Sequence, residues 1–267
     1  MLAEHGSQAA VYAGGTELLV LMKERLVHFP RLVDIKSIPG LNGIEVDGDE
    51  LVIGALVTHR QIERSPVVQE YAPLLAEVEA NVANTRVRAA GTIGGNLCFA
   101  EPHSDPATLL IAWEATLRLE SIERTRTLPL GDFFTGLFET AREPFEILTE
   151  IRIPLPLQVP IGSAYERFKI HERPTATVAA VLKLDGEVVA DARIVVGSVG
   201  THPERIAAAE DVLVGERPAG PLLSEVAAIV HDAVEPTEDK FESSDYKRHL
   251  ARVLTERALK SAAERAA

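Results

Sequence analysis

"AGTIGGNLCFAEPHSDPATLL", residues 90–110, is the stretch that indicates the fold most directly. Gly91, Gly94 and Gly95 surround a Thr-Ile pair in it, and Asn96 and Asp105 follow. Glycine loses more conformational entropy on folding than any other residue, so a cluster of glycines needs a structural reason. We therefore expect the backbone of this stretch to approach another group closely.

A second cluster, YAGGTELLVLMKERL at residues 12–26, places Gly14, Gly15 and Thr16 before an apolar helix. Neither cluster matches the dinucleotide fingerprint G-x-G-x-x-G or the P-loop pattern, and either one alone is typical of a tight turn. Together they offer consecutive backbone N–H groups beside Thr or Asn side chains, the chemistry of an anion-binding concavity. If both turns face one point, the sequence predicts a pyrophosphate site there. Gly95 would lie in the middle of such a nest, where a β-branched side chain would be forced to positive φ.

The composition excludes several classes of partner. The chain has 267 residues, with 27 basic and 40 acidic side chains, so its formal charge is 27 − 40 = −13. Such an acidic chain is a poor candidate for binding nucleic acid or an anionic membrane surface. No apolar run is long enough to span a bilayer. The opening residues lack the basic start and apolar centre of a signal peptide, so we expect a cytoplasmic protein.

Cys98 is the only cysteine. It excludes an internal disulfide and any all-cysteine metal cluster in this chain. Without a second thiol nearby, Cys98 is typical of a small apolar filler. The single tryptophan, Trp113, is expected in the core.

Hydrophobic spacing and turn signals predict a mixed, α+β order of elements. The end of a helix, stopped at Gly6, precedes a strand at 10–13. Asp-Gly turns predict two hairpins, at 43–59 and 175–200. Further strands are expected at 31–37, 116–121 and 145–155, and helices at 65–84, 105–115, 204–215, 221–234 and 244–265. We place a domain boundary after Pro154, giving units 1–154 and 155–267, the first with a small subdomain up to about residue 40.

The two motifs together resemble a known family. AGGTELLVLMK followed by RAAGTIGGNLCFAEPHSDPATLL is similar to the FAD-binding medium subunit of the molybdenum hydroxylases, the xanthine dehydrogenase and carbon monoxide dehydrogenase family. The likeness covers nearly the whole chain, through EILTEIRIP, AYERFKIHERPTATVAAVLKL and VGSVGTHPERIAAAEDVLVG. It implies a two-subdomain FAD-binding fold of the PCMH/VAO type, with a C-terminal α/β domain of the carbon monoxide dehydrogenase flavoprotein type.

The resemblance also implies a set of cofactor-binding residues and no catalytic residue or metal ligand. Two backbone segments would wrap the FAD pyrophosphate, and single residues would contact the cofactor elsewhere. The implied residues are Ala13, Gly14, Gly15, Thr16, Glu17, Leu18, Leu19, Val82, Thr92, Ile93, Gly94, Gly95, Asn96, Asp105, Leu148 and Lys169.

In the family, a large molybdenum-pterin subunit hydroxylates the substrate, and a small subunit with two [2Fe–2S] clusters carries the electrons. The resemblance therefore implies an oxidoreductase subunit in a dimerised heterotrimer, whose FAD passes electrons to an external acceptor. Family members begin with a further strand and most of a helix before the first glycine motif. Here only LAEHGS remains of that helix, which indicates a late start codon or a shortened natural form.

Several alternatives remain open on the sequence alone. Asp105 is either the N-cap of the helix that begins at Pro106 or an acid near the cofactor, or both. His103, beside Asp105, suggests acid–base chemistry, which flavin reduction by an electron carrier does not need. Lys169 on an alternating strand is also typical of a solvated face. At the level of the whole chain, the alternatives are a stand-alone flavin oxidase of the vanillyl-alcohol type and a FAD-free scaffold subunit.

Overall fold

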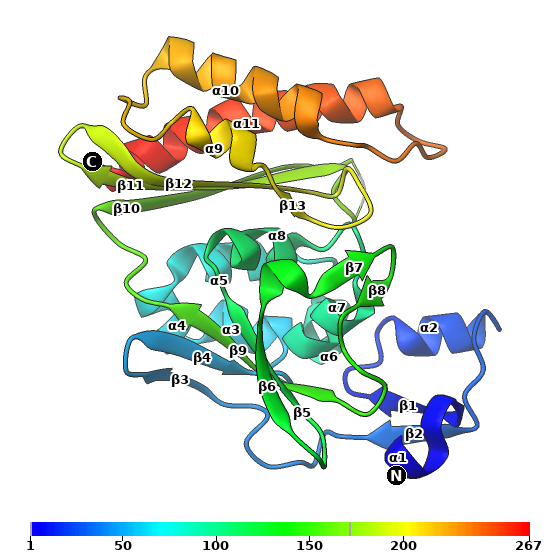
Figure 1. Cartoon of the computed structure of the whole chain (residues 1–267). Coiled ribbons are helices and arrows are strands. Elements are labelled where there is room, and N and C mark those ends of the chain that lie inside the picture. The colour runs from blue at the N-terminus through cyan, green and yellow to red at the C-terminus, as the bar shows by residue number, and fades with distance from the viewer. Residues whose placement is uncertain (1, 171) are drawn as a thin grey trace.

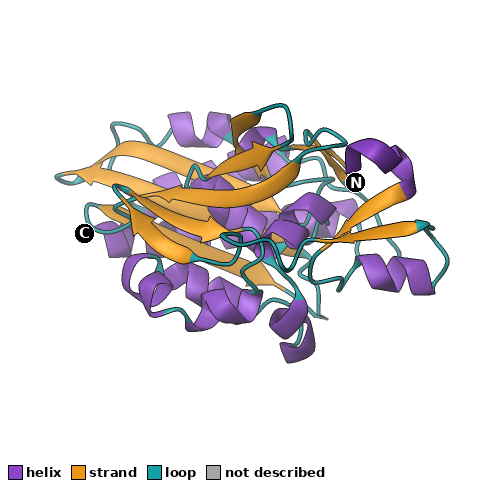
Figure 2. Cartoon of the chain, turned by 90° about the horizontal axis from the view of Figure 1, so that it is seen from below, coloured by secondary structure: helices purple, strands orange, loops and turns teal. Residues whose placement is uncertain are grey.

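The computed structural model describes residues 2–170 and 172–267. Its small N-terminal unit holds two parallel strands with a helix between them (Figure 1). The elements are α1 (Leu2–His5), a 3₁₀ turn (Gly6–Gln8), β1 (Ala9–Tyr12), α2 (Leu18–Lys23) and β2 (Arg31–Asp34). Figure 2 shows this strand pair set apart from the larger sheets.

The middle unit is built on a five-stranded antiparallel sheet of order β3-β4-β9-β5-β6. Its strands are β3 (Ile44–Asp47), β4 (Glu50–Gly54), β5 (Thr116–Glu120), β6 (Thr125–Pro129) and β9 (Ile147–Pro154). Six short helices lie between β4 and β5: α3 (His59–Arg64), α4 (Pro66–Tyr71), α5 (Pro73–Glu79), α6 (Thr85–Ala90), α7 (Ile93–Phe99) and α8 (Asp105–Ala112). A 3₁₀ turn (Leu130–Asp132) and a small hairpin, β7 (Phe134–Gly136) and β8 (Glu139–Thr140), complete the unit.

Two expectations for this unit need correction. The single helix expected over 65–84 is divided into α4 and α5, with Ala72 between them at φ −142°, ψ 54°. Pro73 causes the break, because proline has no N–H and disfavours a helical conformation in the residue before it. The second glycine motif is not a turn but the first half of α7, which begins after Thr92.

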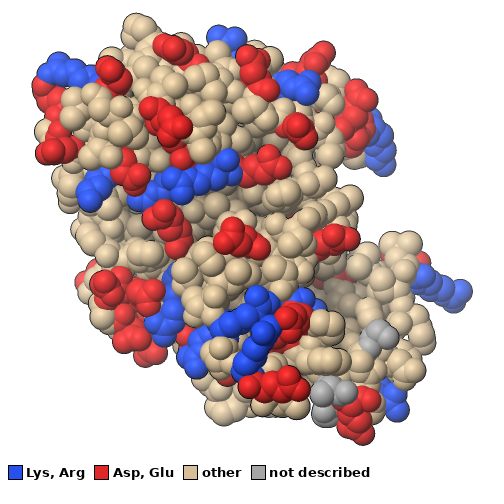
Figure 3. Space-filling view, viewed as in Figure 1, with Lys and Arg blue, Asp and Glu red and all other residues tan. Residues whose placement is uncertain are grey.

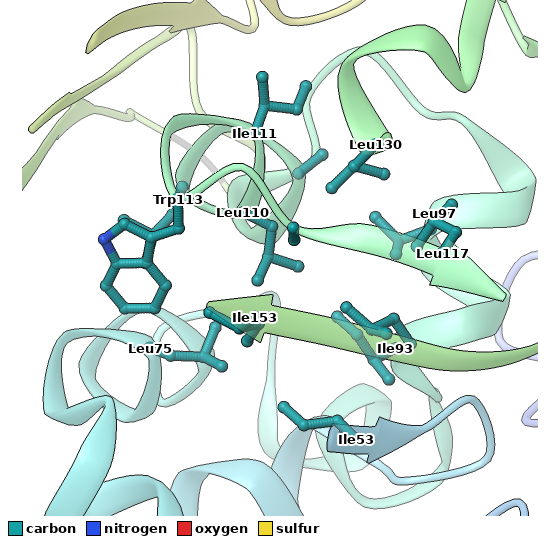
Figure 4. Close-up of a cluster of buried hydrophobic side chains, with 14 of the residues drawn as sticks. Ile53, Leu75, Ile93, Leu97, Leu110, Ile111, Trp113, Leu117, Leu130 and Ile153 are labelled. Atoms are coloured by element: carbon teal, nitrogen blue, oxygen red, sulfur yellow. The ribbon is translucent and has the colours of Figure 1, made fainter. Parts of the chain in front are cut away.

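The main core lies between the antiparallel sheet and α8. Figure 4 shows Leu110 of α8 pointing toward the strand that carries Ile153. Trp113 is 2% exposed, as expected, and its indole N–H donates to Ser163 Oγ at 3.0 Å. This core fixes α7 and α8, which carry the second half of the glycine-rich stretch.

The C-terminal unit is a four-stranded antiparallel sheet of order β10-β11-β12-β13 with helices on one face (Figure 1). Its strands are β10 (Ile161–Phe168), β11 (Ala176–Asp185), β12 (Val188–Gly197) and β13 (Glu204–Arg205), and its helices are α9 (Ala207–Asp211), α10 (Gly220–Ala233) and α11 (Ser244–Ala266). The helix expected from residue 204 starts only at Ala207, because Glu204 and Arg205 pair with β12 instead. The other face of this sheet packs on α8.

Candidate functional site

A cleft of about 470 Å³ lies where the small N-terminal unit meets the middle unit. Figure 3 shows the surface hollowed between them. Thirteen of the residues expected to bind the cofactor line this cleft: Ala13, Gly14, Gly15, Thr16, Glu17, Leu18, Val82, Thr92, Gly94, Gly95, Asn96, Asp105 and Leu148.

Leu19, Ile93 and Lys169 do not line it. Leu19 is 43% exposed on α2, whereas Ile93 is 1% exposed and packs into the main core. The Lys169 ammonium donates to the carbonyl oxygen of Asn81 at 3.3 Å.

The first glycine segment presents unpaired backbone donors to the cleft. Within the described parts of the chain, the N–H groups of residues 14–18 donate to no acceptor. Gly15 has φ +72°, a conformation that L side chains rarely adopt. This segment therefore has the free donors and the conformation that an anion-binding turn requires.

The N–H groups of the second segment, in contrast, are mostly used inside the protein. The Ile93 and Gly94 N–H groups donate to the carbonyl oxygens of Val57 and Ala55, each at 3.0 Å. The Gly95 N–H group donates to Thr92 Oγ1 at 3.1 Å. The expected nest around Gly95 is therefore wrong, and Gly95 lies in a helix rather than at positive φ.

Asn96 supplies a side-chain donor instead. Its Oδ1 accepts from Ser104 Oγ at 2.6 Å, and its Nδ2 donates to none of the residues that the structure describes. Asn96 lines the cleft, so its amide N–H₂ group is available to a bound molecule.

The two segments lie directly against each other. A side chain on Gly14 would overlap the carbonyl oxygen of Ala90, and one on Gly91 would stand 3.2 Å from Thr16 Oγ1. Gly94 lies equally close to the backbone of Ala55. Close backbone packing thus explains Gly14 and Gly94, and it brings the two segments to one point, which is the condition for a shared pyrophosphate site.

Asp105 is a buried acid rather than a helix cap. Ser104 is the N-cap residue of α8, and the Asp105 carboxylate accepts a hydrogen bond from the Tyr165 hydroxyl at 2.8 Å. Arg167 lies 3.5 Å from the same oxygen. Burial raises the pKa of Asp105, and the contacts with Tyr165 and Arg167 oppose this only in part. The capping role is excluded, and a role beside the cofactor stays a prediction.

Two charged residues that the sequence did not indicate, Arg173 and Glu101, lie at the cleft wall. Arg173 contacts Glu101 at 2.5 Å and Glu17 at 3.5 Å, and so connects the C-terminal unit to both sides of the cleft. His103 pairs with Glu101 at 2.7 Å, not with Asp105. Burial raises the pKa of Glu17, which the Arg173 charge opposes. Burial also acts to raise the pKa of Glu101, but the His103 hydrogen bond and the Arg173 charge outweigh it and lower that pKa.

His59 and Glu79 form a pair that the sequence also did not indicate, and His59 lines the cleft. Their side chains are 3% and 0% exposed, and His59 Nδ1 lies 2.6 Å from Glu79 Oε2. The sequence marks the start of α3 by the capping box between Thr58 and Gln61. It gives no sign that a residue 20 positions away completes the pair.

Within residues 2–170 and 172–267, no group of His, Cys, Asp and Glu has the arrangement of a metal site. Burial raises the pKa of the Cys98 thiol to about 11, so the thiol stays protonated at neutral pH.

No described helix is long and apolar enough to cross a membrane.

The cleft has the chemistry of a flavin dinucleotide site. Its volume falls in the range of small-molecule pockets, and its lining is mainly apolar with a few convergent polar groups. The free N–H groups of residues 14–18 suit phosphate oxygens. Val82, Leu148 and Phe99 give the cleft an apolar lining that suits an aromatic ring. The residues present therefore fit FAD.

Comparison with known proteins gives the same cofactor. Residues 1–156 match the family described as the FAD binding domain in molybdopterin dehydrogenase, and residues 163–262 match the CO dehydrogenase flavoprotein C-terminal domain. The chain is 36% identical to the carbon monoxide dehydrogenase medium chain of Hydrogenophaga pseudoflava, over 100% of this chain and 93% of the relative. It is 31% identical to the caffeine dehydrogenase subunit beta of Pseudomonas sp. strain CBB1, over 99% and 90%.

Solved structures agree. Carbon monoxide dehydrogenase from Hydrogenophaga pseudoflava superposes with a TM-score of 0.96 at 37% identity, covering 100% of this chain and 93% of that one. Quinoline 2-oxidoreductase from Pseudomonas putida 86 superposes with a TM-score of 0.93 at 30% identity, covering 99% and 92%. The fold, the cleft and the relatives together show that the chain belongs to the family of FAD-binding medium subunits of the molybdenum hydroxylases.

Proposed function

We propose that this chain is the electron-transfer subunit of a molybdenum hydroxylase, taking electrons from [2Fe–2S] clusters on a small subunit and passing them to an external acceptor. The hydroxylation itself belongs to a large molybdenum-pterin subunit. The single cysteine supports this division, because a cluster with four cysteine ligands needs more thiols than the chain has. The predicted cytoplasmic location and the domain boundary after Pro154 belong to the same proposal.

The free donors of residues 14–18 are the observation that carries the proposal. These N–H groups bind the pyrophosphate of FAD, and the Asn96 amide faces it from the opposite wall. The apolar side chains of Val82 and Leu148 exclude water from the ring system. When bound, FAD supplies the redox chemistry, accepting electrons singly or in pairs.

The Arg173 bridge between Glu101 and Glu17 has a positioning role in this proposal. It connects the C-terminal unit to the first glycine segment, because Glu17 belongs to that segment. This contact holds the donors of the small unit against the middle unit.

The test is the visible absorption spectrum of the purified chain, followed by acid release and identification of the flavin. We expect non-covalent FAD, in a ratio near one per chain. A chain without flavin after reconstitution would support the FAD-free scaffold. Flavin that stays attached to denatured protein, or FMN in place of FAD, would contradict the proposed site.

Co-purification distinguishes the stand-alone oxidase. With its natural partners expressed, the chain should elute in a complex that contains molybdenum and iron. An FAD-loaded chain that elutes alone and oxidises an alcohol would favour an oxidase of the vanillyl-alcohol type.

A further inference from the structure

The pair formed by His59 and Glu79 is a buried charge site that the proposed function does not use. Glu79, on α5, is fully buried, and its Oε1 has no hydrogen-bond partner among the described residues. Its Oε2 meets His59 Nδ1 at 2.6 Å. A buried carboxylate with one hydrogen-bond partner is costly unless a nearby positive charge balances it.

The Glu79 carboxylate influences the far side of the His59 ring. A carboxylate beside Nδ1 either accepts from a neutral imidazole, whose Nε2 is then an acceptor, or pairs with the imidazolium, in which both ring nitrogens are donors. A negative charge on each side of the ring favours the imidazolium. A phosphate oxygen at Nε2 would therefore meet an N–H donor.

The position of His59 directs this donor to the cleft. The His59 side chain lines the cleft, and its Nε2 bonds to none of the residues that the structure describes. Unlike Glu79 Oε1, this nitrogen is not sealed from solvent. Cδ2, the carbon bonded to Nε2, lies 3.2 Å from the point where a Cβ on Gly91 would stand, and Thr16 Oγ1 lies at the same distance from that point. The donor thus lies where the two glycine segments meet.

We propose that His59 is a further cofactor-binding residue, whose Nε2–H donates to a phosphate oxygen of FAD, and that Glu79 is the positioning residue that keeps this proton in place. The inference rests on the proposed FAD site. His59 supplies a positively polarised side chain at a point where the second glycine segment offers few donors. The N–H groups of that segment are already bonded to Val57, Ala55 and Thr92. A hydrogen bond that involves a charged group is stronger than a neutral one.

The variant that tests this removes the pair without leaving a buried charge. His59→Leu combined with Glu79→Leu replaces a buried ion pair by apolar side chains, a change that proteins commonly tolerate. The matched control is Arg152→Leu combined with Glu50→Leu. That pair joins β9 to β4 at 2.6 Å, and neither of its residues lines the cleft.

FAD dissociation constants are measured by titrating the flavin-free full-length chains, with thermal melts of the same samples. We expect the His59/Glu79 double variant to melt like the parent and to bind FAD at least about tenfold more weakly, while the control binds within about twofold of the parent. Unchanged affinity in the double variant, or an equal loss in the control, would overturn the inference. A parent chain that binds no FAD would overturn the proposed function itself.

A second measurement uses the unaltered chain and does not depend on the variant folding. In protein labelled with ¹⁵N-histidine, FAD should shift the Nε2 resonance of His59, while the resonance of His231, which does not line the cleft, stays in place. Loss of the signal in His59→Gln assigns it. No shift of the His59 resonance on saturation with FAD would overturn the inference.

Discussion

Gly14 faces the carbonyl oxygen of Ala90 with only a hydrogen atom, and this contact joins the small unit to the middle unit. Gly14→Ala should therefore separate the two halves of the cleft. We expect a loss of FAD and a destabilisation of roughly 1–3 kcal/mol, the usual cost of overpacking. Flavin content and thermal melts measure both. Gly43→Ala is the control, because nothing lies within 4 Å of its added carbon. If Gly14→Ala had the same flavin content and melting temperature as this control, the close approach of Gly14 to Ala90 would have no role.

Glu146 makes the stability of the cleft wall depend on pH. Hydrogen bonds from Arg126, at 2.7 Å to each oxygen, outweigh the effect of burial and lower the pKa of Glu146 from 4.5 to about 2. A lowered folded-state pKa contributes stability that is present above the ordinary pKa and lost as pH falls toward 2. The full contribution is on the order of 3 kcal/mol. We expect the melting temperature of the parent to fall toward that of Glu146→Gln between about pH 5 and 2. A constant difference across this range would contradict the prediction.

Among the elements, those set by local chemistry were predictable from sequence. The hairpins turn at Gly48 (φ +63°) and Gly186 (φ +62°), where the Asp-Gly signals lie. Elements decided by distant contacts were not predictable. Thr92 begins a helix because Val57 and Ala55, on another segment, accept the N–H groups of Ile93 and Gly94. Similarly, Glu204 and Arg205 join a sheet edge although their sequence continues into a helix.

The same contrast applies to the site. Both glycine motifs were recognised locally, but the pairing of His59 with Glu79 and of Arg173 with Glu17 depends on the folded chain. Neither pair leaves a periodic or spaced pattern in the sequence.

Helix α11 and strand β10 meet so closely at Gly162 that an added Cβ would overlap the backbone of α11 at Ala262. Gly162→Ala should push this helix off the sheet and lower the melting temperature by several degrees, for a cost of roughly 1–3 kcal/mol. Because Gly162 does not line the cleft, the folded fraction should keep its FAD. Melts and flavin content test both statements, with Gly131→Ala as the control, where the nearest atom is 3.8 Å from the added carbon. A Gly162→Ala variant that loses FAD but keeps the melting temperature of the parent would contradict both predictions.

For the whole molecule, we predict a strict division of labour. The isolated FAD-loaded chain should accept electrons from NADH or a chemical reductant but should not hydroxylate a heterocycle, an aldehyde or carbon monoxide. Dye reduction with such a panel, with and without the molybdenum and iron–sulfur subunits, measures this. Substrate turnover by the lone, metal-free chain would instead support a stand-alone oxidase.

The small N-terminal unit has very little core of its own. Helix α2 has no buried residue, and the nearby cluster consists of Ile35, Leu41 and Leu56. Segments with so few buried contacts open without global unfolding, and a ligand that bridges such a segment to the rest of the protein closes it by mass action. FAD would bridge the two units here, so proteases should cut the flavin-free chain within residues 18–30 and spare the loaded one. Degradation in the cell would then remove unloaded chains before they reach assembly.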